Sequence, residues 1–419
     1  MNQKYKASKL LHSSKSEDEH FIKNISITSK DNARLVAIRD RVRKALRDGF
    51  NDLSGQKIIS EKYKHYLQMG FTSDQFETVI KLAPKFWTQG SFAYKTLNSP
   101  AKTPPQQIDI DDGIYFPMTF VEDEPVAVKE LLFKLVDQIL RDIAEQYGWE
   151  LNTKKPTCSR LVIDEGIHMD IPIYAIPETK AEHLEKALVL REGNLSFESD
   201  AAVFDAVVLD PGEVYLAMRT EQHWTKSDPK KVKDWFEGEC DLHPKMLRRV
   251  CRYLKAWRDH TWDNGGPSSI CLMVAAAETF SNQIFNHPTE DGKTFVHDCQ
   301  ALLAVARALP TQLSGEIKNP AEDGEVMFPR GQTKEELDEI VRQANRFKAS
   351  IEYALCYAKT KEEVVAYFQS VLGPRFPNNP DAVDTFVKAD EIKAIPPITN
   401  SSAPATPANQ RSAIKYRSA

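Results

Sequence analysis

The segment QIDIDDGIYF, residues 107–116, has the alternating pattern of a β-strand. Successive side chains of a strand point to opposite faces, so Ile108 and Ile110 can enter a core while Asp109 and Asp111 share the other face. Aspartate is rare in strands, and two like charges on one face repel each other. A divalent cation is the simplest compensation, and Mg²⁺ prefers carboxylate oxygens and phosphates.

The next two residues limit this interpretation. Asp112 is predicted to face the other way and, with Gly113, to form a turn or bulge rather than to supply a further ligand. A solvated edge strand would show the same acidic pattern, because short motifs also occur without any function. Residues elsewhere in the chain must therefore decide between a metal site and a polar edge.

A later strand pattern supplies a third carboxylate. Residues 161–163 and 167–176 have strand patterns around a polar turn, and Asp170 falls on the face away from the aliphatic side chains. It follows Asp111 by 59 positions (170 − 111), with a helical pattern over 125–147 between them. Two strands that flank a helix can bring the three carboxylates together.

Gly90 and Ser91 form a second candidate feature, a turn at a helix start. Such a turn can present backbone N–H groups and a hydroxyl to a phosphate. Glycine and serine are also ordinary turn residues, so this pair alone is weak evidence.

The first long helical pattern, residues 31–50, carries Arg39, Arg43 and Arg47 on its expected outer face. This row is either an anion-binding ridge or a solvated face. With Lys85 and Trp87 nearby in the chain, the ridge would suit a small anionic, aromatic regulator.

The second half of the chain is predicted to be helical. On the helix that begins near residue 244, Arg248, Arg252 and Lys255 lie on one face and could meet phosphates, although a solvated surface is the simpler explanation. Helical spacing covers residues 232–236, 244–261, 267–282, 294–309, 333–358 and 360–372.

The composition describes an ordinary globular chain of 419 residues with 41% hydrophobic residues and a net charge of −5. This charge argues against a surface that binds nucleic acid non-specifically. Six cysteines without a Cys-x-x-Cys pair indicate reduced thiols. No apolar run has the length of a signal peptide or of a membrane span, so we expect a cytoplasmic protein without membrane contact.

The order Gly90-Ser91, Asp109-Ile-Asp111 and Asp170 resembles the active-site signature of the DNA polymerase β-like nucleotidyltransferase superfamily. The surrounding sequences look like the bacterial cGAS/DncV-like nucleotidyltransferases, and most like the dinucleotide cyclase group that makes cyclic GMP-AMP. These matches are QGSFAYKT (89–96), DIDDG (109–113), HMDIPIYAIP (168–177), WTKSDP (224–229) and RYLKAWR (252–258).

The resemblance implies an α+β fold, with a polymerase-β-like nucleotidyltransferase core around a mixed sheet and a C-terminal oligoadenylate-synthetase-like helical domain. We expect a flexible N-terminus at 1–28, the core at 29–220 and the helical domain at 221–377. Residues 378–419 are rich in Pro, Ala, Ser, Asn and Thr and are expected to form a disordered tail.

The resemblance also implies roles for individual residues. Asp109 and Asp111 would hold two Mg²⁺ ions, with Mn²⁺ as the alternative metal. Asp170 would hold the catalytic ion and help to deprotonate the attacking 3′-hydroxyl. The further nucleotide-binding residues would be Gln89, Gly90, Ser91, Tyr94, Ser227, Asp228 and Lys255.

Two features depart from the family pattern. The linker from Ser91 to Asp109 is longer than the superfamily usually has. The cysteine/histidine zinc module of the animal DNA sensor is missing, so DNA is not expected to be an obligatory partner.

The expected function is the joining of ATP and GTP into 3′,3′-cyclic GMP-AMP in bacterial anti-phage signalling, with a downstream effector that senses the product. The alternatives are a linear oligonucleotide or tRNA nucleotidyltransferase and a non-catalytic nucleic-acid sensor or scaffold. In some systems of this family a ubiquitin-transfer-like protein conjugates the enzyme through its C-terminal residue, which here is Ala419.

Overall fold

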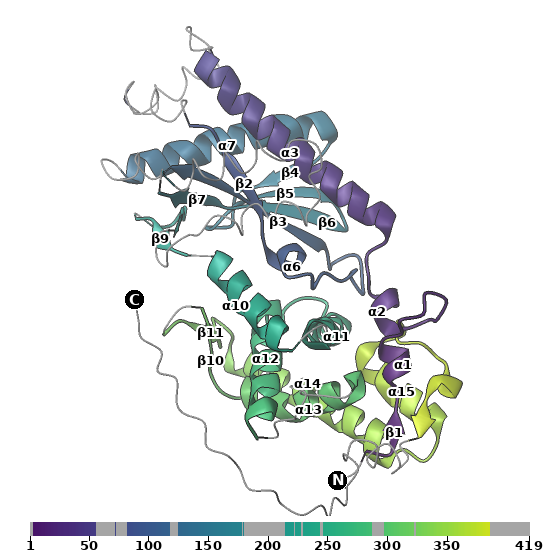
Figure 1. Ribbon diagram of the computed structural model, residues 1–419. Helices are drawn as coiled ribbons and strands as arrows, with labels where there is room; N and C mark the ends of the chain where they lie inside the picture. Colours follow the sequence, from purple (N-terminus) through teal and green to yellow (C-terminus); the bar gives the residue numbers. More distant parts are fainter. Residues whose placement is uncertain are drawn as a thin grey trace, which may run out of the picture.

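The computed structural model describes residues 3–55, 72, 82–117, 125–177, 179, 214–221, 223–227, 229–243, 246–286, 297–321 and 324–385. These residues form two lobes, one built around a mixed sheet and one made of helices (Figure 1). The expected α+β architecture is therefore confirmed. None of the described helices combines the length and the apolar character needed to cross a membrane.

The sheet of the first lobe has the strand order β4-β5-β6-β3-β7-β8-β9, and β2 pairs with β3. The strand β3 is parallel to β6 and β7, and the other pairs are antiparallel, so the sheet is mixed. The strands are β2 (Lys85–Thr88), β3 (Ile108–Pro117), β4 (Glu150–Asn152), β5 (Ser159–Asp164), β6 (Ile167–Ile171), β7 (Ile173–Ile176), β8 (Tyr215–Leu216) and β9 (Thr225–Lys226).

The register along β3 is constant. Ile108 lies opposite Ile167 on β6, and Pro117 lies opposite Ile176 on β7, so the 59-residue offset holds over both ladders. Pro172 has no N–H to donate and separates β6 from β7, while its carbonyl still accepts from the Ile114 N–H at 2.9 Å. One consequence is that Asp111 lies directly opposite Asp170.

Two long helices cover the face of the sheet that lies away from the helical lobe (Figure 1): α3 (Ser29–Gly55) and α7 (Pro125–Tyr147). The short helix α6 (Gly90–Ala93) lies toward the helical lobe. The predicted apolar stripe of α3 is confirmed, because its four members are buried in the core of the sheet lobe. They are Leu35, Ile38, Val42 and Leu46.

The outer-face prediction for the arginine row is wrong for Arg39 and Arg43, whereas Arg47 is exposed as predicted. Arg39 and Arg43 are buried, and Trp87, which was expected beside an accessible ridge, is buried as well. The guanidinium of Arg43 forms a two-pronged ion pair with the carboxylate of Asp112 and donates to the hydroxyl of Thr88 at 3.0 Å. Buried charges require such pairing, and the partner comes from a strand 69 positions away in the chain.

The turn predicted at Asp112 and Gly113 is also wrong, because both residues lie inside β3. Here β2 pairs with the strand, with Thr88 opposite Asp112 and Trp87 opposite Gly113. The strand stays regular because Arg43 neutralises the buried carboxylate of Asp112. Asp112 does face away from Asp109 and Asp111, as the alternation predicts.

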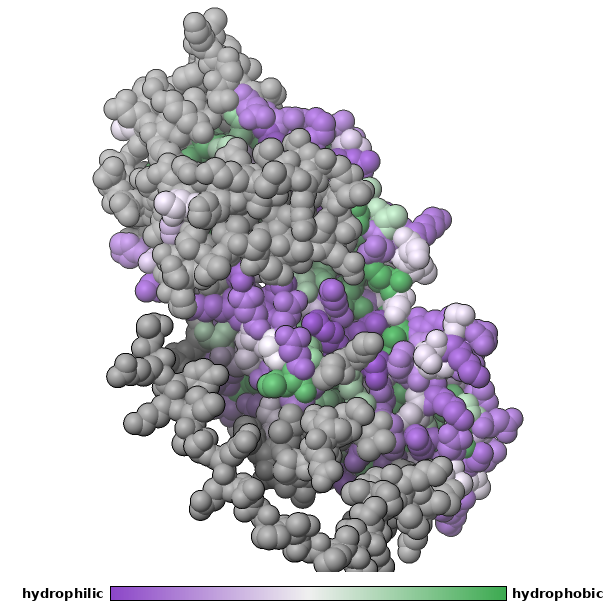
Figure 2. All heavy atoms as spheres, viewed as in Figure 1, coloured by the Kyte–Doolittle hydropathy of each residue, from purple (hydrophilic) through white to green (hydrophobic). Residues whose placement is uncertain are grey.

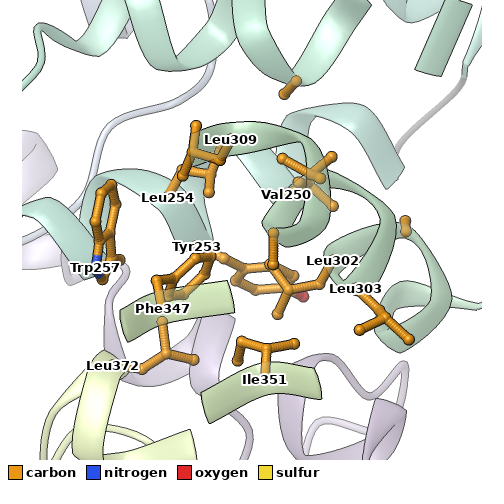
Figure 3. Close-up of a cluster of buried hydrophobic side chains, with 14 of the residues drawn as sticks. Val250, Tyr253, Leu254, Trp257, Leu302, Leu303, Leu309, Phe347, Ile351 and Leu372 are labelled. Atoms are coloured by element: carbon orange, nitrogen blue, oxygen red, sulfur yellow. The ribbon is translucent and has the colours of Figure 1, made fainter. Parts of the chain in front are cut away.

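The helical lobe confirms the predicted helices. It contains α10 (Pro229–Leu242), α11 (Met246–Thr261), α12 (Ser269–Asn286), α13 (Asp298–Leu313), α14 (Lys334–Glu352) with the π-turn η2 (Tyr353–Tyr357), α15 (Lys361–Leu372), and the hairpin β10 (Ile317–Lys318) and β11 (Val326–Phe328). A capping box of Thr333 and Glu336 opens α14. Side chains of α11, α13, α14 and α15 interdigitate in the core shown in Figure 3.

Residues 3–28, where we expected a flexible N-terminus, contain regular elements that pack on the helical lobe. They form β1 (Tyr5–Lys6), α1 (Ser8–Leu11) and α2 (Phe21–Asn24), whose apolar side chains enter the core of the helical lobe. The predicted tail is likewise ordered over 378–385, where η3 (Pro380–Ala382) precedes β12 (Asp384–Thr385) and β12 pairs with β1. The rest of the tail, residues 386–419, lies outside the described residues.

Candidate active site

The edge between β3 and β6 brings Asp109, His168 and Asp170 together. One donor atom from each lies within 4.8 Å of the others. Asp109 and His168 are opposite each other in the parallel ladder, and His168 Nε2 is 2.9 Å from Asp109 Oδ1. The Asp109 side chain is 43% exposed, so the group opens to solvent on its side of the sheet.

Asp170 is held as an anion by two cations. Arg160, from the neighbouring strand β5, donates to both of its oxygens at 2.6 and 2.7 Å, and Lys155 donates at 2.7 Å. Burial acts to raise the pKa of Asp170, but the hydrogen bonds from Arg160 and Lys155 outweigh it and leave this pKa below its ordinary value. Asp170 therefore stays ionised.

Asp111 has the opposite environment. Burial, reinforced by the charges of Asp109 and Asp170, raises its pKa well above the ordinary value. Its carboxylate lies against Gly90, where an added Cβ would fall 1.9 Å from Asp111 Oδ2. Gly90 also has a φ of +63°, which few other residues adopt, so both its conformation and its neighbour require glycine.

The residues present fit a divalent cation. Asp109 Oδ1 and His168 Nε2 are buried atoms that take part in no hydrogen bond within the described part of the chain. Oxygen and imidazole donors around one point are a common ligand set for divalent metals. Asp109 and Asp170, two of the three predicted ligands, belong to this group, and Asp111 lies beside it with its side chain turned toward Gly90.

A cleft of about 610 Å³ opens between the two lobes in front of this edge. It is lined by the predicted Gly90, Ser91, Tyr94 and Lys255, together with Asp109 and Asp111. The helical lobe contributes α11, the loop after it and the start of α12. In the space-filling view, hydrophilic side chains gather where the described parts of the lobes meet (Figure 2).

The remaining predicted nucleotide contacts lie elsewhere. The Gln89 amide donates to the Tyr115 hydroxyl at 2.6 Å and accepts from the Tyr174 hydroxyl at 3.2 Å, and Gln89 does not line the cleft. Ser227 follows β9 and does not line it either. Asp228 lies outside the described residues.

Lys255 is buried at the base of the cleft, where its ammonium group donates to the carbonyl of Thr96 at 2.8 Å. Burial, with Arg258 nearby, lowers its pKa to about 8. Its neighbours in the basic row, Arg248 and Arg252, bind the Tyr94 carbonyl and the Asn98 side chain. The row therefore holds the lobes together, which neither sequence interpretation anticipated.

The unusually long linker before β3 makes several hydrogen bonds to the helical lobe. Asn98 exchanges hydrogen bonds with Arg252, and the Gln106 amide donates to the carbonyls of Asp259 and Trp262 at 2.6 and 2.9 Å. Lys102 pairs with Asp263. The extra length is thus used to attach the helical lobe and to build one wall of the cleft.

Sequence reasoning missed His168, Arg160 and Lys155 as site residues. Alternation does place His168 on the same face as Asp170, so this signal was present. The two cations sit on and before a different strand, and only the strand order of the folded sheet brings them to Asp170.

Two family models match the chain. Residues 84–174 match "Cyclic GMP-AMP synthase DncV-like, nucleotidyltransferase domain", and residues 244–385 match "Cyclic GMP-AMP synthase, C-terminal domain". The acidic edge lies in the first region, and Lys255 lies in the second.

Curated relatives and solved structures agree. A cyclic GMP-AMP synthase of Vibrio cholerae is 34% identical over 72% of this chain and 76% of its own, and one of Escherichia coli is 32% identical over 85% and 89%. The structure of Vibrio cholerae DncV with the linear intermediate 5′ pppA(3′,5′)pG aligns with a TM-score of 0.72 at 28% identity, covering 92% of this chain and all of that one. A mutant of the same enzyme, in complex with ATP, GTP and 5MTHFGLU2, aligns with a TM-score of 0.72 at 29% identity, covering 91% and 99%.

Proposed function

The chain belongs to the family of DncV-like cyclic GMP-AMP synthases and is a nucleotidyltransferase, and from this premise we propose that it joins ATP and GTP into 3′,3′-cyclic GMP-AMP. Each half-reaction is an attack of a ribose 3′-hydroxyl on an α-phosphate with release of pyrophosphate. The second attack closes the ring. The cleft between the acidic edge and α11 is the place for both nucleotides.

Phosphoryl transfer depends mainly on positioning and on neutralising charge. Gly90 and Ser91 present backbone donors and a hydroxyl at the start of α6, on the cleft wall. Lys255 lines the cleft from the opposite lobe, which supports its proposed contact with the donor triphosphate. For Gln89, Tyr94, Ser227 and Asp228 we retain nucleotide-binding roles as proposals from the family resemblance.

Asp109, Asp111 and Asp170 are the proposed holders of two Mg²⁺ ions, with Mn²⁺ as the substitute. When bound, such ions neutralise phosphate charge and favour the ionised form of the attacking hydroxyl. The ionised state of Asp170 suits a ligand. Asp170 keeps the role that the family resemblance implies, which is to hold the catalytic ion and help to deprotonate the attacking 3′-hydroxyl.

The observation that carries this proposal is the meeting of the acidic edge and Lys255 across one interlobe cleft. The test is incubation of the purified protein with all four nucleoside triphosphates and Mg²⁺, followed by mass analysis. We expect a phosphatase-resistant product with the mass of cyclic GMP-AMP, and its loss in Asp111→Ala. Full turnover by Asp111→Ala would contradict the site assignment.

A linear nucleotidyltransferase is the enzymatic alternative, because it would use the same carboxylates. Its products keep a terminal phosphate that phosphatase removes, whereas a ring has none. Products that shift after phosphatase treatment would favour this alternative over a cyclase. A nucleic-acid scaffold would instead bind nucleic acid without consuming any triphosphate.

A role in anti-phage signalling in the cytoplasm, with a downstream effector that senses the product, is also part of the proposal and rests on the family resemblance. We further propose conjugation through Ala419 by a ubiquitin-transfer-like partner. Deleting Ala419 should abolish conjugation and leave synthesis by the purified enzyme intact. Normal conjugation of the shortened protein would exclude this role.

We also retain the proposal of a regulatory site near Arg39, Arg43, Lys85 and Trp87. Arg39, Arg43 and Trp87 are buried, so this site is not the exposed ridge that the sequence suggested. Arg43 is already paired with Asp112, so an anion that binds there must replace that carboxylate. The compound 5MTHFGLU2, which the Vibrio cholerae structure contains, is the first ligand to test. Unchanged binding to an Arg39→Ala, Arg43→Ala double variant would exclude the site.

A further inference from the structure

His168 lies between Gln107 and Asp109, and its two ring nitrogens have different surroundings. Nδ1 is 2.9 Å from Gln107 Oε1, and Nε2 is 2.9 Å from Asp109 Oδ1. The ring itself is buried, while Asp109 opens toward the cleft. The imidazole is therefore held in place at the acidic edge, within 4.8 Å of the oxygens of both Asp109 and Asp170.

The orientation of the Gln107 amide is fixed by the turn after β5. Its Nε2 donates to the carbonyls of Asp164 and Glu165 at 3.1 and 3.2 Å. A flipped amide would place its oxygen against these two carbonyl oxygens, where no donor exists. Gln107 Oε1 is therefore the atom that faces the ring, and an amide oxygen only accepts hydrogen bonds.

Nδ1 must then carry a proton, because it has to donate to Gln107. In a neutral imidazole the other nitrogen carries a lone pair. That lone pair faces an oxygen of Asp109 at 2.9 Å, and neither of these two atoms makes a hydrogen bond among the described residues. In the neutral form these two electron-rich atoms repel each other, and either a second ring proton or a metal ion bound to both removes the repulsion.

We propose that His168 Nε2 is a metal ligand, so that the site next to Asp109 has a nitrogen donor in addition to its carboxylates. Two ligands at about 2.1 Å from one ion and at right angles to each other lie roughly 3.0 Å apart, close to the observed separation. Gln107 acts as the positioning residue that selects the tautomer, as partners of metal-binding histidines commonly do. The inference rests on the metal-dependent reaction proposed above.

A nitrogen donor changes which metal the site prefers. Imidazole nitrogen binds first-row transition-metal ions, Mn²⁺ included, more strongly than it binds Mg²⁺, whereas carboxylate oxygens suit Mg²⁺. The protein should therefore bind Mn²⁺ more tightly than Mg²⁺, and this preference should decrease when His168 is replaced.

The test uses Mn²⁺ alone with the full chain, read by electron spin echo envelope modulation, which detects nitrogen bonded to the ion. Wild-type protein should show imidazole nitrogen coupling, and His168→Gln should lose it and bind Mn²⁺ about tenfold more weakly. His260→Gln is the matched control, because His260 lies on α11 and lines no part of the cleft. It should leave both readouts unchanged.

Gln107→Leu keeps the ring and removes its positioning partner, so it tests the inference even where His168→Gln fails to fold. We expect Mn²⁺ affinity to fall about 10- to 100-fold. Bound Mn²⁺ without nitrogen coupling in the wild type would overturn the ligand role and make His168 a hydrogen-bond donor to Asp109, leaving the proposed cyclase intact. Absence of Mn²⁺ binding together with absence of metal-dependent product would overturn both.

Discussion

At the scale of single residues, the environment of Asp111 disfavours its ionised carboxylate and thereby lowers the stability of the fold. Its carboxylate is enclosed by the Gly90 turn, with Asp109 and Asp170 nearby, and all of these raise its pKa. In the metal-free protein its ionised form is therefore disfavoured. Sites that hold reactive charge commonly sacrifice stability in this way.

Asp111→Asn should raise the thermal midpoint of the metal-free protein at pH 7 to 8 and abolish nucleotide turnover. The folded protein holds this proton to a higher pH than the unfolded chain, whose pKa is near 3.8, so stability decreases as pH rises between the two values. The asparagine side chain of the variant carries no charge and would escape this loss. The check is thermal unfolding in EDTA over pH 4 to 8, with exposed Asp338→Asn as the control; an equal or lower midpoint for Asp111→Asn would contradict the expectation.

The lowered pKa of Lys255 predicts how the activity of the enzyme changes at alkaline pH. Its pKa of about 8 means that the free enzyme loses this charge above pH 8, so kcat/KM for the triphosphate should fall there. The folded pKa lies below the ordinary 10.5, so the unfolded chain binds more protons between the two values and stability does not fall with the rate. Lys255→Arg keeps its charge at pH 9 and should flatten this decrease; an unchanged profile in this variant would assign it to another group.

At the scale of elements, the first helices of the chain belong to a lobe that is formed mostly by the described parts of residues 229–385. The helices α1 and α2 insert Leu10, Leu11 and Phe21 among side chains of α11 and α13. Phe21 stacks on Tyr253 with ring centroids 5.9 Å apart. The helical lobe is therefore completed by residues that come before the sheet lobe in the sequence.

Phe21→Ala should destabilise the protein by about 3–5 kcal/mol, because it removes a fully buried ring from this core. Urea unfolding measured by tryptophan fluorescence reports the change. Leu242→Ala is the matched control, since Leu242 is 60% exposed and its loss should cost less than about 0.5 kcal/mol. Similar costs for the two variants would show that α2 is not part of the cooperative core.

How much of the fold and of the candidate site could be predicted from the sequence depends on the length over which a pattern repeats. The alternation around Asp109 and the stripe on α3 extend over many residues, and both were predicted correctly. The four-residue helices α1 and α2 are too short to show a period. Burial of Arg43 depends on Asp112, a partner that no local rule connects to it.

At the scale of the whole molecule, polar contacts of the segment between Ser91 and Asp109 join the two lobes among the described residues. Arg252 is central to this junction. Its guanidinium donates to Asn98 Oδ1 and to the Ser26 hydroxyl, each at 2.8 Å, while its carbonyl accepts from the Asn98 amide. The width of the cleft therefore depends on hydrogen bonds that hold the lobes in one arrangement.

Arg252→Met should loosen this arrangement and raise KM for both nucleotides several-fold. The variant leaves the buried Asn98 side chain short of a partner, which costs about 1–3 kcal/mol. Steady-state kinetics with small-angle scattering would reveal a higher KM and a larger radius of gyration. Arg342→Met, at a side chain that is 74% exposed, serves as the control; unchanged KM in Arg252→Met would show that other contacts suffice.

The pairing of β1 with β12 has a practical consequence. Tyr5 and Thr385 are partners in one antiparallel ladder, at the end of the helical lobe away from the sheet (Figure 1). A short linker between these residues would close the described fold into a ring, and folds with neighbouring ends often tolerate circular permutation. New ends opened at the exposed Gly331, between β11 and α14, would provide attachment points that leave the paired strands and the cleft intact.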